Sequence, residues 1–310
     1  MARVVFMGTP EFAVPTLWAL AEHQQVTGVV TQPDRQAGRG RTLVESSVKQ
    51  VAMERGLPIF QPENLGGPEP LAHLAAWRPD AVVVAAFGQL LPVTVLDLPP
   101  HGCLNVHASL LPRYRGAAPI AAAILSGDAV TGITIMRMDE GLDTGPILAQ
   151  AECPIAHDDT TGSMTDKLAE LGADLLLKTL DGWLAGTVEA RPQDDAQATY
   201  CSQLEKEDGL LDWLKPAAYL DRQMRACDPW PGAFTRWQGK RLKVLRARPL
   251  PGWQGKGQPG QVLEIGKGIG VATGEGALEL LEVQLAGKKP MPAAVFARGQ
   301  RDLIGGLLGT

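Results

Sequence analysis

The sequence predicts an α/β protein with a doubly wound parallel sheet in its N-terminal part and a smaller β-barrel in its C-terminal part. Three observations predict this class. Apolar runs typical of fully buried strands alternate with segments of helical spacing in the first part of the chain. The last part instead holds short strand-like runs separated by Gly and Pro. A polar, unpatterned stretch at 188–206 lies between the two.

In the N-terminal part, predicted strands and helices follow one another. Short apolar runs predict strands at 3–8, 26–31, 57–62 and 81–88, and HGCL begins another at 101–104. The near-continuous run AVVVAAF suits a parallel strand covered on both faces. Helical spacing between the strands predicts helices at 9–20, 44–56 and 71–77. In such a sheet, ligands bind beyond the carboxyl ends of the strands.

The pattern changes from residue 131 onward. Two apolar runs flank the polar segment 139–145, which predicts two strands joined by a loop. A long amphipathic helix is predicted over 160–186, with an apolar face made by Met164, Leu168, Leu171 and Leu175. Short strands of the barrel are predicted at 233–237, 241–247, 260–265, 268–273 and 277–285. We therefore expect one domain at 1–187, a linker at 188–206 and a second domain at 207–310.

Composition excludes several classes of protein. An apolar fraction of 45% and a charged fraction of 20% are those of a globular protein with a sizeable core. The four cysteines are widely spaced and form no CxxC pair, so we expect neither a zinc site nor a disulfide framework, and a reducing cytoplasm is the default compartment. No apolar run approaches the length of a membrane span, and the first residues lack a signal-peptide layout.

Charge differs between the two parts of the chain. Residues 1–200 carry 13 basic and 23 acidic side chains, whereas residues 201–310 carry 16 and 11. The span 229–263 holds seven basic residues and no acid. This asymmetry favours a polyanion as partner of the second part. Ordinary scatter of surface charge is the alternative explanation.

Two polar residues stand where the strand that begins at HGCL ends. Asn105 and His107 are two positions apart, so in a strand they face the same side. An amide can donate to a developing oxyanion, and an imidazole can donate or move a proton, which suits attack on a carbonyl. If Asp143 approaches His107, its carboxylate would orient the ring. The alternatives are a strand-end histidine with a capping asparagine, and a solvated loop at 139–145.

A basic loop follows the second predicted strand. The segment TQPDRQAGRGRTL carries Arg35, Arg39 and Arg41, which could bind phosphates or could belong to an ordinary surface loop. The first turn reads MGTPEF and lacks the GxGxxG fingerprint, so a dinucleotide site is not expected. The acids of the 139–145 loop lack the ligand spacing of a calcium loop.

Taken together, these segments resemble the methionyl-tRNA formyltransferase family over nearly the whole chain. The run NVHASLLPRYRGAAPI with the later aspartate is shared by the wider 10-formyltetrahydrofolate-dependent formyltransferases. The match also includes FMGTPEFAVPTL and MDEGLDTGPIL. The segments specific to the tRNA enzymes are the PDRQAGRGR loop and the C-terminal signatures YCSQLEKEDGLLDW, RACDPWPGAF and GKKPMPAAVFARG.

The resemblance implies a Rossmann-like N-terminal domain, an OB-like C-terminal barrel and a formyl transfer to initiator methionyl-tRNA. Asn105, His107 and Asp143 match the family's catalytic set. The donor, 10-formyltetrahydrofolate, is expected at Phe87, Gly88, Gln89, Leu90, Ser109, Leu110, Leu111, Pro112, Asp139, Glu140 and Gly141. Relatives often have Tyr at position 87, and Phe87 lacks that hydroxyl. The tRNA is expected at Arg35, Arg39, Arg41, Lys206, Arg236, Lys240, Arg241 and Lys243.

The resemblance also implies a cytoplasmic monomer that needs neither a metal nor a membrane. Three other functions are alternatives. A formyltransferase acting on a small amine, such as glycinamide ribonucleotide or an amino sugar, would not need the basic barrel or the arginine loop. A noncatalytic RNA-binding protein would not need the Asn-His-Asp set, and a nucleotide-sugar or NAD enzyme is disfavoured by the missing glycine fingerprint.

Overall fold

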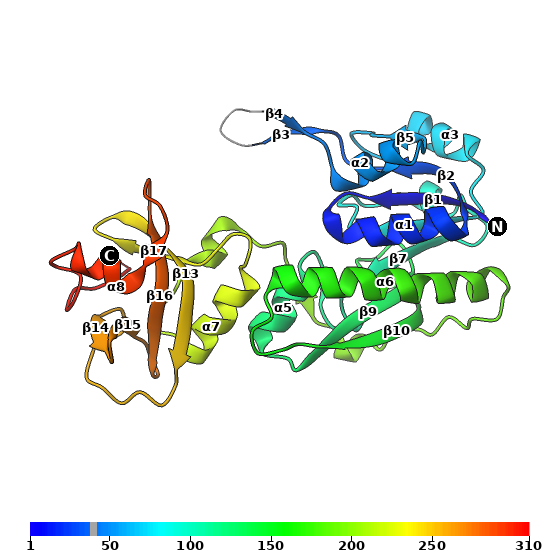
Figure 1. Ribbon diagram of the computed structural model, residues 1–310. Coiled ribbons are helices and arrows are strands. Elements are labelled where there is room, and N and C mark those ends of the chain that lie inside the picture. The colour runs from blue at the N-terminus through cyan, green and yellow to red at the C-terminus, as the bar shows by residue number, and fades with distance from the viewer. Residues whose placement is uncertain (38–41, 310) are drawn as a thin grey trace. The chain divides into compact units, whose positions relative to one another are not determined.

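The structure is a computed structural model that describes residues 1–37 and 42–309 (Figure 1). The chain divides into two compact units. The first comprises 1–119, 130–154 and 164–201, and the second comprises 120–129, 155–163 and 202–310. Each unit is described on its own.

The first unit is built on a seven-stranded sheet in the order β10-β9-β7-β6-β1-β2-β5. Its strands are β1 (Arg3–Gly8), β2 (Gln25–Val30), β5 (Ile59–Phe60), β6 (Ala81–Ala85), β7 (Cys103–His107), β9 (Val130–Arg137) and β10 (Ile147–Pro154). The pairings from β7 through β5 are parallel, whereas β9 and β10 add antiparallel strands at one edge. The predicted doubly wound α/β architecture is confirmed, as are the two strands predicted on either side of 139–145.

The helices that pack on this sheet form where apolar residues recur at helical spacing and where the sequence has residues that favour a helix start. They are η1 (Glu11–Ala13), α1 (Val14–His23), α2 (Ser47–Glu54), α3 (Pro68–Ala76), α4 (Val93–Leu96) and α6 (Thr161–Leu184). At the start of α2, the Ser46 hydroxyl accepts a hydrogen bond from the Lys49 backbone N–H at 3.0 Å, the usual role of an N-cap serine. The predictions included α1, α2, α3 and α6 but not the short helix α4.

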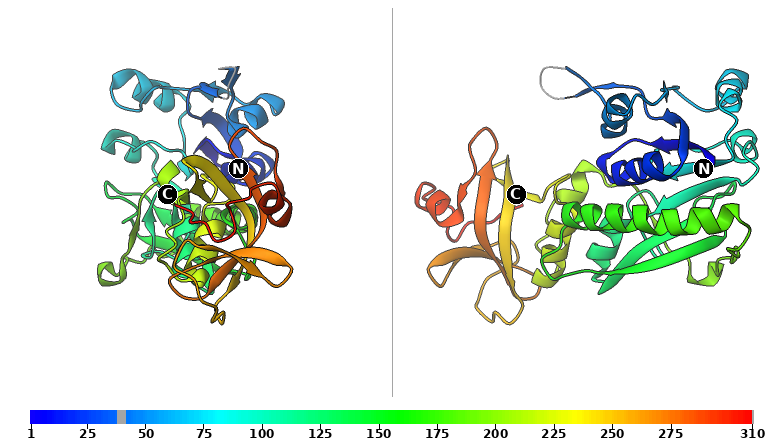
Figure 2. Two further views of the ribbon diagram at one scale, coloured as in Figure 1. Left: turned by 90° about the vertical axis from the view of Figure 1, so that its left-hand side faces the viewer. Right: turned by 45° about the vertical axis from the view of Figure 1, so that its right-hand side comes forward.

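The long helix α6 lies alongside β9 and β10 (Figure 2). Its most buried positions include Met164, Leu168, Gly172 and Leu176, whereas the predicted Leu171 and Leu175 are only half-buried. A Cβ on Gly172 would come within 2.8 Å of Val106, so glycine allows α6 to pack tightly against β7. The predicted apolar face is therefore confirmed at Met164 and Leu168, but Leu171 and Leu175 lie at its flank, and the prediction missed Gly172.

The topology gathers the polar segments at one end of the sheet. Residues 87–90 follow β6, and residues 108–116 follow β7, which runs parallel to β6. The loop between β9 and β10 returns to the same place, since β9 runs antiparallel to β7 with His107 opposite Thr134. Loops after adjacent parallel strands converge at the carboxyl edge, the usual ligand site of such sheets.

The second unit contains an antiparallel six-stranded sheet in the order β12-β13-β16-β15-β14, with β17 paired to β16. The strands are β12 (Phe234–Trp237), β13 (Lys240–Leu250), β14 (Val262–Ile265), β15 (Gly268–Ala272), β16 (Ala277–Leu285) and β17 (Met291–Pro292). The sheet is curled, but among the described residues no strand pairing joins β12 to β14. The predicted closed barrel is therefore not confirmed.

Helical elements of the second unit were not predicted. They are α5 (Pro119–Ser126), whose first residue belongs to the first unit, η3 (Lys206–Gly209), α7 (Ala217–Ala226) and α8 (Ala293–Arg298). Leu220 of α7 and Phe296 of α8 belong to the apolar core of the sheet. In the same core the Trp213 indole N–H donates to the Thr235 hydroxyl at 3.0 Å.

The basic loop after β2 forms a short hairpin, β3 (Arg35–Ala37) and β4 (Thr42–Val44). Arg35 is exposed, and its Nη2 donates to Gln32 Oε1 at 3.3 Å. Arg39 and Arg41 lie outside the described residues. None of the helices in the described ranges is both long and apolar enough to cross a membrane.

Candidate active site

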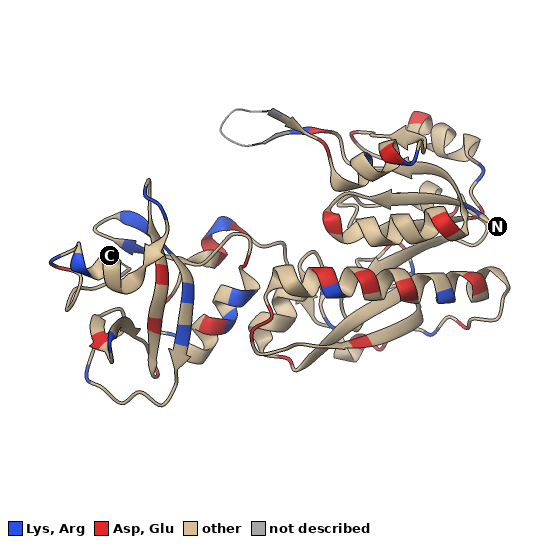
Figure 3. Ribbon diagram, viewed as in Figure 1, with Lys and Arg blue, Asp and Glu red and all other residues tan. Residues whose placement is uncertain are grey.

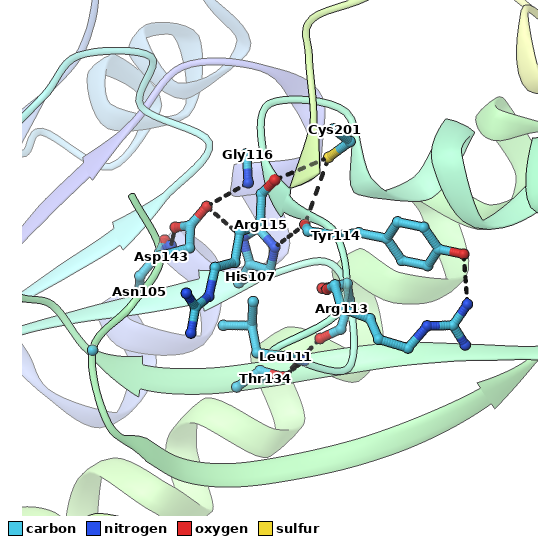
Figure 4. A network of polar contacts seen from close by, with 12 residues as sticks. Asn105, His107, Leu111, Arg113, Tyr114, Arg115, Gly116, Thr134, Asp143 and Cys201 are labelled. Carbon is cyan, nitrogen blue, oxygen red and sulfur yellow. Dashed lines mark hydrogen bonds and ion pairs between the residues drawn. The ribbon is translucent and has the colours of Figure 1, made fainter. Parts of the chain in front are cut away.

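The carboxyl end of β7 presents two of the predicted residues on one side of the sheet (Figure 4). Asn105 is half-buried and His107 is only 6% exposed. The strand alternation places both side chains on the same face, and the following segment turns back over the histidine. A polar pair so close to the core needs partners, because buried polar groups are costly without hydrogen bonds.

Asp143 supplies one partner for each of these residues. Asn105 Nδ2 lies 3.4 Å from Asp143 Oδ1, and His107 Nδ1 lies 3.6 Å from Asp143 Oδ2. The same Oδ2 accepts a 2.8 Å hydrogen bond from the Gly116 backbone N–H. The structure therefore brings carboxamide, imidazole and carboxylate together, although 38 positions separate Asn105 from Asp143 in the chain.

The other ring nitrogen of His107 faces the backbone. His107 Nε2 lies 3.0 Å from the carbonyl oxygen of Tyr114, and a carbonyl can only accept. Nε2 therefore carries a proton, which leaves Nδ1 directed toward the carboxylate of Asp143. The ring is thus held between the Tyr114 carbonyl on one side and the Asp143 carboxylate on the other.

The segment after β7 is held by its own hydrogen bonds. The Ser109 side chain is fully buried, and its hydroxyl donates to the Arg113 carbonyl at 2.6 Å. Thr134 of β9 donates to the Ser109 carbonyl at 2.7 Å and accepts from the Leu111 N–H at 3.0 Å. Leu111 is buried, whereas Leu110 and Pro112 are half-buried. The Ser109 hydroxyl thus holds the loop, and its proton is donated to the Arg113 carbonyl.

The residues after β6 divide between core and surface. Phe87 is 2% exposed and belongs to an apolar cluster, while Leu90 is 83% exposed. The Phe87 carbonyl accepts from the Thr9 hydroxyl at 3.0 Å. Gly88 has φ +81°, a left-handed conformation that favours glycine. Gln89 Nε2 lies 3.3 Å from the Pro62 carbonyl.

A recess of about 310 Å³ lies beside the 139–145 loop. The Asp139 carboxylate organises this loop, because its Oδ1 accepts from the Gly141 N–H at 3.1 Å and from the Thr144 hydroxyl at 2.6 Å. Glu140 and Gly141 are exposed. The recess combines an apolar part with acidic and basic side chains, and its lining is Val93, Leu96, Asp97, Arg137, Met138, Asp139, Glu140 and Pro146.

In the second unit, the predicted basic residues gather on the β12–β13 hairpin (Figure 3). Arg236 lies directly opposite Arg241, and Lys243 lies opposite Phe234. The Arg241 guanidinium stacks 3.6 Å from the centre of the Phe234 ring. Arg241 Nε is buried without a hydrogen-bond partner among the residues the structure describes.

The remaining basic residues are less concentrated. Lys240 pairs with Trp237 at the turn of the hairpin and is exposed. Lys206 is exposed in η3, next to Glu205 and Glu207. The hairpin residues thus form a local cationic surface, whereas Lys206 lies among acids.

Sequence comparison covers both parts of the chain. The family described as "Formyl transferase" matches residues 2–180, and "Formyl transferase, C-terminal domain" matches residues 203–301. A methionyl-tRNA formyltransferase from Roseiflexus castenholzii is 50% identical over 309 residues, which cover 99% of both chains. The methionyl-tRNA formyltransferase from Methylococcus capsulatus is 49% identical, with 99% of this chain and 100% of the relative covered.

Solved structures share the fold at lower identity. An N-formyltransferase from Helicobacter canadensis in complex with folinic acid and dTDP-3-aminofucose matches with a TM-score of 0.66 at 18% identity, covering 90% of this chain and 99% of the other. HypX from Aquifex aeolicus in complex with tetrahydrofolic acid matches with a TM-score of 0.62 at 20% identity. The match covers 98% of this chain and 48% of HypX, so the chain spans about half of that protein. At such identities the likeness concerns the fold alone.

Proposed function

The chain belongs to the methionyl-tRNA formyltransferase family, and from this membership we propose that it transfers a formyl group to the α-amine of methionine esterified to initiator tRNA. About half of its residues match curated members of the family along 99% of its length. The observation that carries the chemistry is the convergence of Asn105, His107 and Asp143 at the end of β7.

The formyl donor is proposed to be 10-formyltetrahydrofolate, which acts as a second substrate. The recess beside the 139–145 loop has features that a pterin ring would need. Val93, Leu96 and Met138 offer an apolar surface for a flat ring, and the carboxylates of Asp139 and Glu140 accept hydrogen bonds from ring N–H groups. Gly88, exposed Leu90, and the 109–112 segment are assigned to the same substrate on the strength of the family resemblance.

Asn105 and His107 are proposed to stabilise negative charge during transfer. When the methionine amine adds to the formyl carbon, the formyl oxygen gains negative charge. The distance of 3.4 Å between Asn105 Nδ2 and Asp143 Oδ1 is long for a hydrogen bond. An oxyanion can therefore replace the carboxylate as the acceptor. A preorganised donor of this kind is worth about 3–4 kcal/mol of transition-state stabilisation.

Asp143 is proposed to orient His107 and to help move a proton from the attacking amine. The 3.6 Å separation between His107 Nδ1 and Asp143 Oδ2 is longer than a direct hydrogen bond, which leaves the Nδ1 side of the ring open to a third group. The proton lost by the amine can then pass to the leaving nitrogen of the donor. The residues proposed for this step act as acid–base groups, and the proposed mechanism has no covalent enzyme intermediate.

The tRNA is proposed to bind the second unit and the arginine loop. Arg236, Arg241 and Lys243 share the outer face of the β12–β13 hairpin, and Lys240 lies at its turn. Contacts between such cations and phosphates position RNA without reading its sequence. Arg35, Arg39 and Arg41 are assigned to the acceptor end, and Lys206 to the phosphate backbone, by family resemblance.

The remaining assignments follow from the same membership. Residues 1–187 are proposed as the catalytic domain, 188–206 as a linker and 207–310 as the tRNA-binding domain, whose curled sheet we interpret as a variant of an OB-like barrel. We propose a monomer acting in the cytoplasm, where charged tRNA is available.

A transfer assay tests the proposed function directly. The purified protein would be given initiator methionyl-tRNA or elongator methionyl-tRNA, with and without 10-formyltetrahydrofolate. We expect formylation only with the donor, and faster with the initiator tRNA. A protein that formylates dTDP-amino sugars or glycinamide ribonucleotide but leaves both tRNAs unchanged would contradict the proposal.

A further inference from the structure

We propose that Gln193 is a positioning residue for formyl transfer, because its side-chain amide fixes the backbone on both sides of Thr144 and so holds the Asp143 carboxylate beside His107. The inference rests on the proposed catalytic role of Asp143. Gln193 lies in the polar stretch 188–206, for which the sequence predicts a linker.

Two hydrogen bonds connect Gln193 to the catalytic loop. Its Nε2 lies 2.8 Å from the carbonyl oxygen of Asp143 and 2.7 Å from that of Gly145. A primary amide has two N–H donors, so one can serve each carbonyl. The two acceptors are separated by a single residue, and fixing both leaves the backbone at Asp143 little freedom to rotate.

A buried arginine fixes the orientation of the Gln193 amide. Gln193 Oε1 accepts from Arg115 Nε at 3.1 Å and from Arg115 Nη2 at 2.8 Å. A flipped amide would place its NH₂ group against the guanidinium and its oxygen against two carbonyls. Arg115 is itself 2% exposed and paired with Asp195 at 2.7 Å, so it forms a firm support for Gln193.

The same arginine belongs to the segment that contacts His107. The preceding residue, Tyr114, provides the carbonyl that faces His107 Nε2, and the following residue, Gly116, provides the N–H that binds the Asp143 carboxylate. Gln193 therefore joins the two segments that meet around the imidazole, one through Arg115 and the other through the carbonyls of Asp143 and Gly145.

Backbone pairing anchors the segment that carries Gln193 within the first unit. Before Gln193, Arg191 exchanges two hydrogen bonds with Ile147, each 2.8 Å long. After it, the Arg115 N–H donates to the Thr199 carbonyl at 2.8 Å, and β11 (Tyr200–Cys201) pairs with β8 (Arg115–Gly116). The glutamine thus projects from a segment that is tied to the protein on both sides.

The backbone of Asp143 is the part that needs support. Asp143 has φ +53°, a left-handed conformation that costs a non-glycine residue on the order of 1–3 kcal/mol and persists only where the surroundings impose it. If the two carbonyl contacts are lost, the loop can relax and the carboxylate moves relative to the ring. A displacement of about 1 Å can lower a rate about 100-fold.

The test substitution is Gln193→Glu. A glutamate keeps the size of the side chain and its contact with Arg115, but it replaces the NH₂ donor by an oxygen that faces two carbonyls. The matched control is Gln197→Glu in the same segment, since Gln197 is exposed and its Nε2 donates only to Asp194, at 2.8 Å, in the described contacts.

We expect Gln193→Glu to lower kcat for formyl transfer about 10- to 100-fold. KM for donor and tRNA should stay within about two-fold, because no substrate contact is assigned to Gln193. Gln197→Glu should leave kcat unchanged. Equal kcat values for the two variants, or a loss confined to KM, would overturn the proposal.

A double-mutant cycle with Asp143→Asn separates positioning from general destabilisation. If Gln193 acts through Asp143, adding Gln193→Glu to Asp143→Asn should produce little further loss of kcat. Additive losses would show that Gln193 acts elsewhere and would overturn the inference. If Asp143→Asn alone keeps the wild-type kcat, the proposed role of Asp143 fails, and the positioning role fails with it. Thermal unfolding of each variant shows whether it is folded in the assay.

Discussion

The end of β7 and the β12–β13 hairpin both gather polar side chains, but they do so in opposite ways. Around His107 the polar groups have protein partners: Asp143 and Tyr114 face the ring, and Gly116 binds the carboxylate. On the hairpin, Arg236 faces Arg241, and neither has an ion pair within the described part of the chain. This contrast fits the proposed roles, a small reacting group at the first region and a large anion at the second.

The same strand shows that the unpaired charge is local. Further along β13, Arg248 forms an ion pair with Glu279 at 2.5 Å, and Arg246 lies opposite Glu282. Like charges that face each other across a strand pair destabilise it by about 0.2–1 kcal/mol. The sheet therefore neutralises one end of β13 and not the other, as expected if the hairpin end contacts phosphates.

Asn105→Ala should have a large effect and tests the catalytic side of this comparison. The alanine removes the donor proposed to stabilise the oxyanion, so we expect kcat to fall about 100- to 1,000-fold. Donor affinity should change far less, because the amide acts mainly in the transition state. Steady-state kinetics with both substrates would measure the split. Unchanged turnover would reject the role assigned to Asn105.

Arg236→Gln tests whether the unpaired charge of the hairpin binds tRNA. Loss of one charge-assisted contact to phosphate should raise KM for tRNA about 10-fold, while kcat stays near wild type. The slope of log affinity against log salt should become shallower by about 1. Relief of the repulsion from Arg241 should leave the unfolding temperature unchanged or higher.

Arg248→Gln is the matched control for the hairpin, because Arg248 is already paired with Glu279. It should affect tRNA binding much less than Arg236→Gln. Equal effects of the two substitutions on KM and on the salt slope would show that charge along β13 acts without regard to position.

The smallest expected effect concerns an ion pair outside both regions. The Arg3 guanidinium, 2.6 Å from Asp80, donates hydrogen bonds that hold the pKa of the Asp80 carboxyl below its usual value. A depressed pKa gives stability that is present above the unfolded-state value of about 3.9 and is lost as pH falls through the folded-state value.

Asp80→Asn should therefore lower the unfolding temperature slightly at pH 7, and the difference from wild type should shrink below about pH 4. The effect is small because both side chains are partly exposed to water. Thermal unfolding across this pH range would measure it. A difference that grows as the pH falls would contradict the assigned cause.

Sequence reasoning succeeded where periodicity was strong. The buried runs of β1 and β6 and the long helix α6 follow from apolar spacing, and Asn105 and His107 stand out because polar residues rarely end a core strand. The approach of Asp143 was a hypothesis, since a loop contact across the fold leaves no periodic signal. The distances to Asp143 come from the structure alone.

The supporting residues could not be found in this way. Gln193 and Arg115 act through side-chain hydrogen bonds between distant segments, and the stretch around Gln193 has no apolar pattern. The available signal in the sequence was Arg115, the second arginine of the PRYRG motif. In the structure its side chain is buried, and a buried guanidinium needs hydrogen-bond partners. Helices α7 and α8 were missed because segments of ten and six residues span too few turns to show a clear helical period.

We propose that Asp143 acts on the reaction through His107, whereas Asp139, four residues earlier, shapes the loop and binds the donor. The most direct measurement is the single-turnover rate of formyl transfer by Asp143→Asn and by Asp139→Asn, with both substrates saturating. We predict a loss of about 100- to 10,000-fold for Asp143→Asn. For Asp139→Asn we predict a weaker donor affinity with a near-normal rate. A normal rate for Asp143→Asn, or the larger loss for Asp139→Asn, would contradict the account.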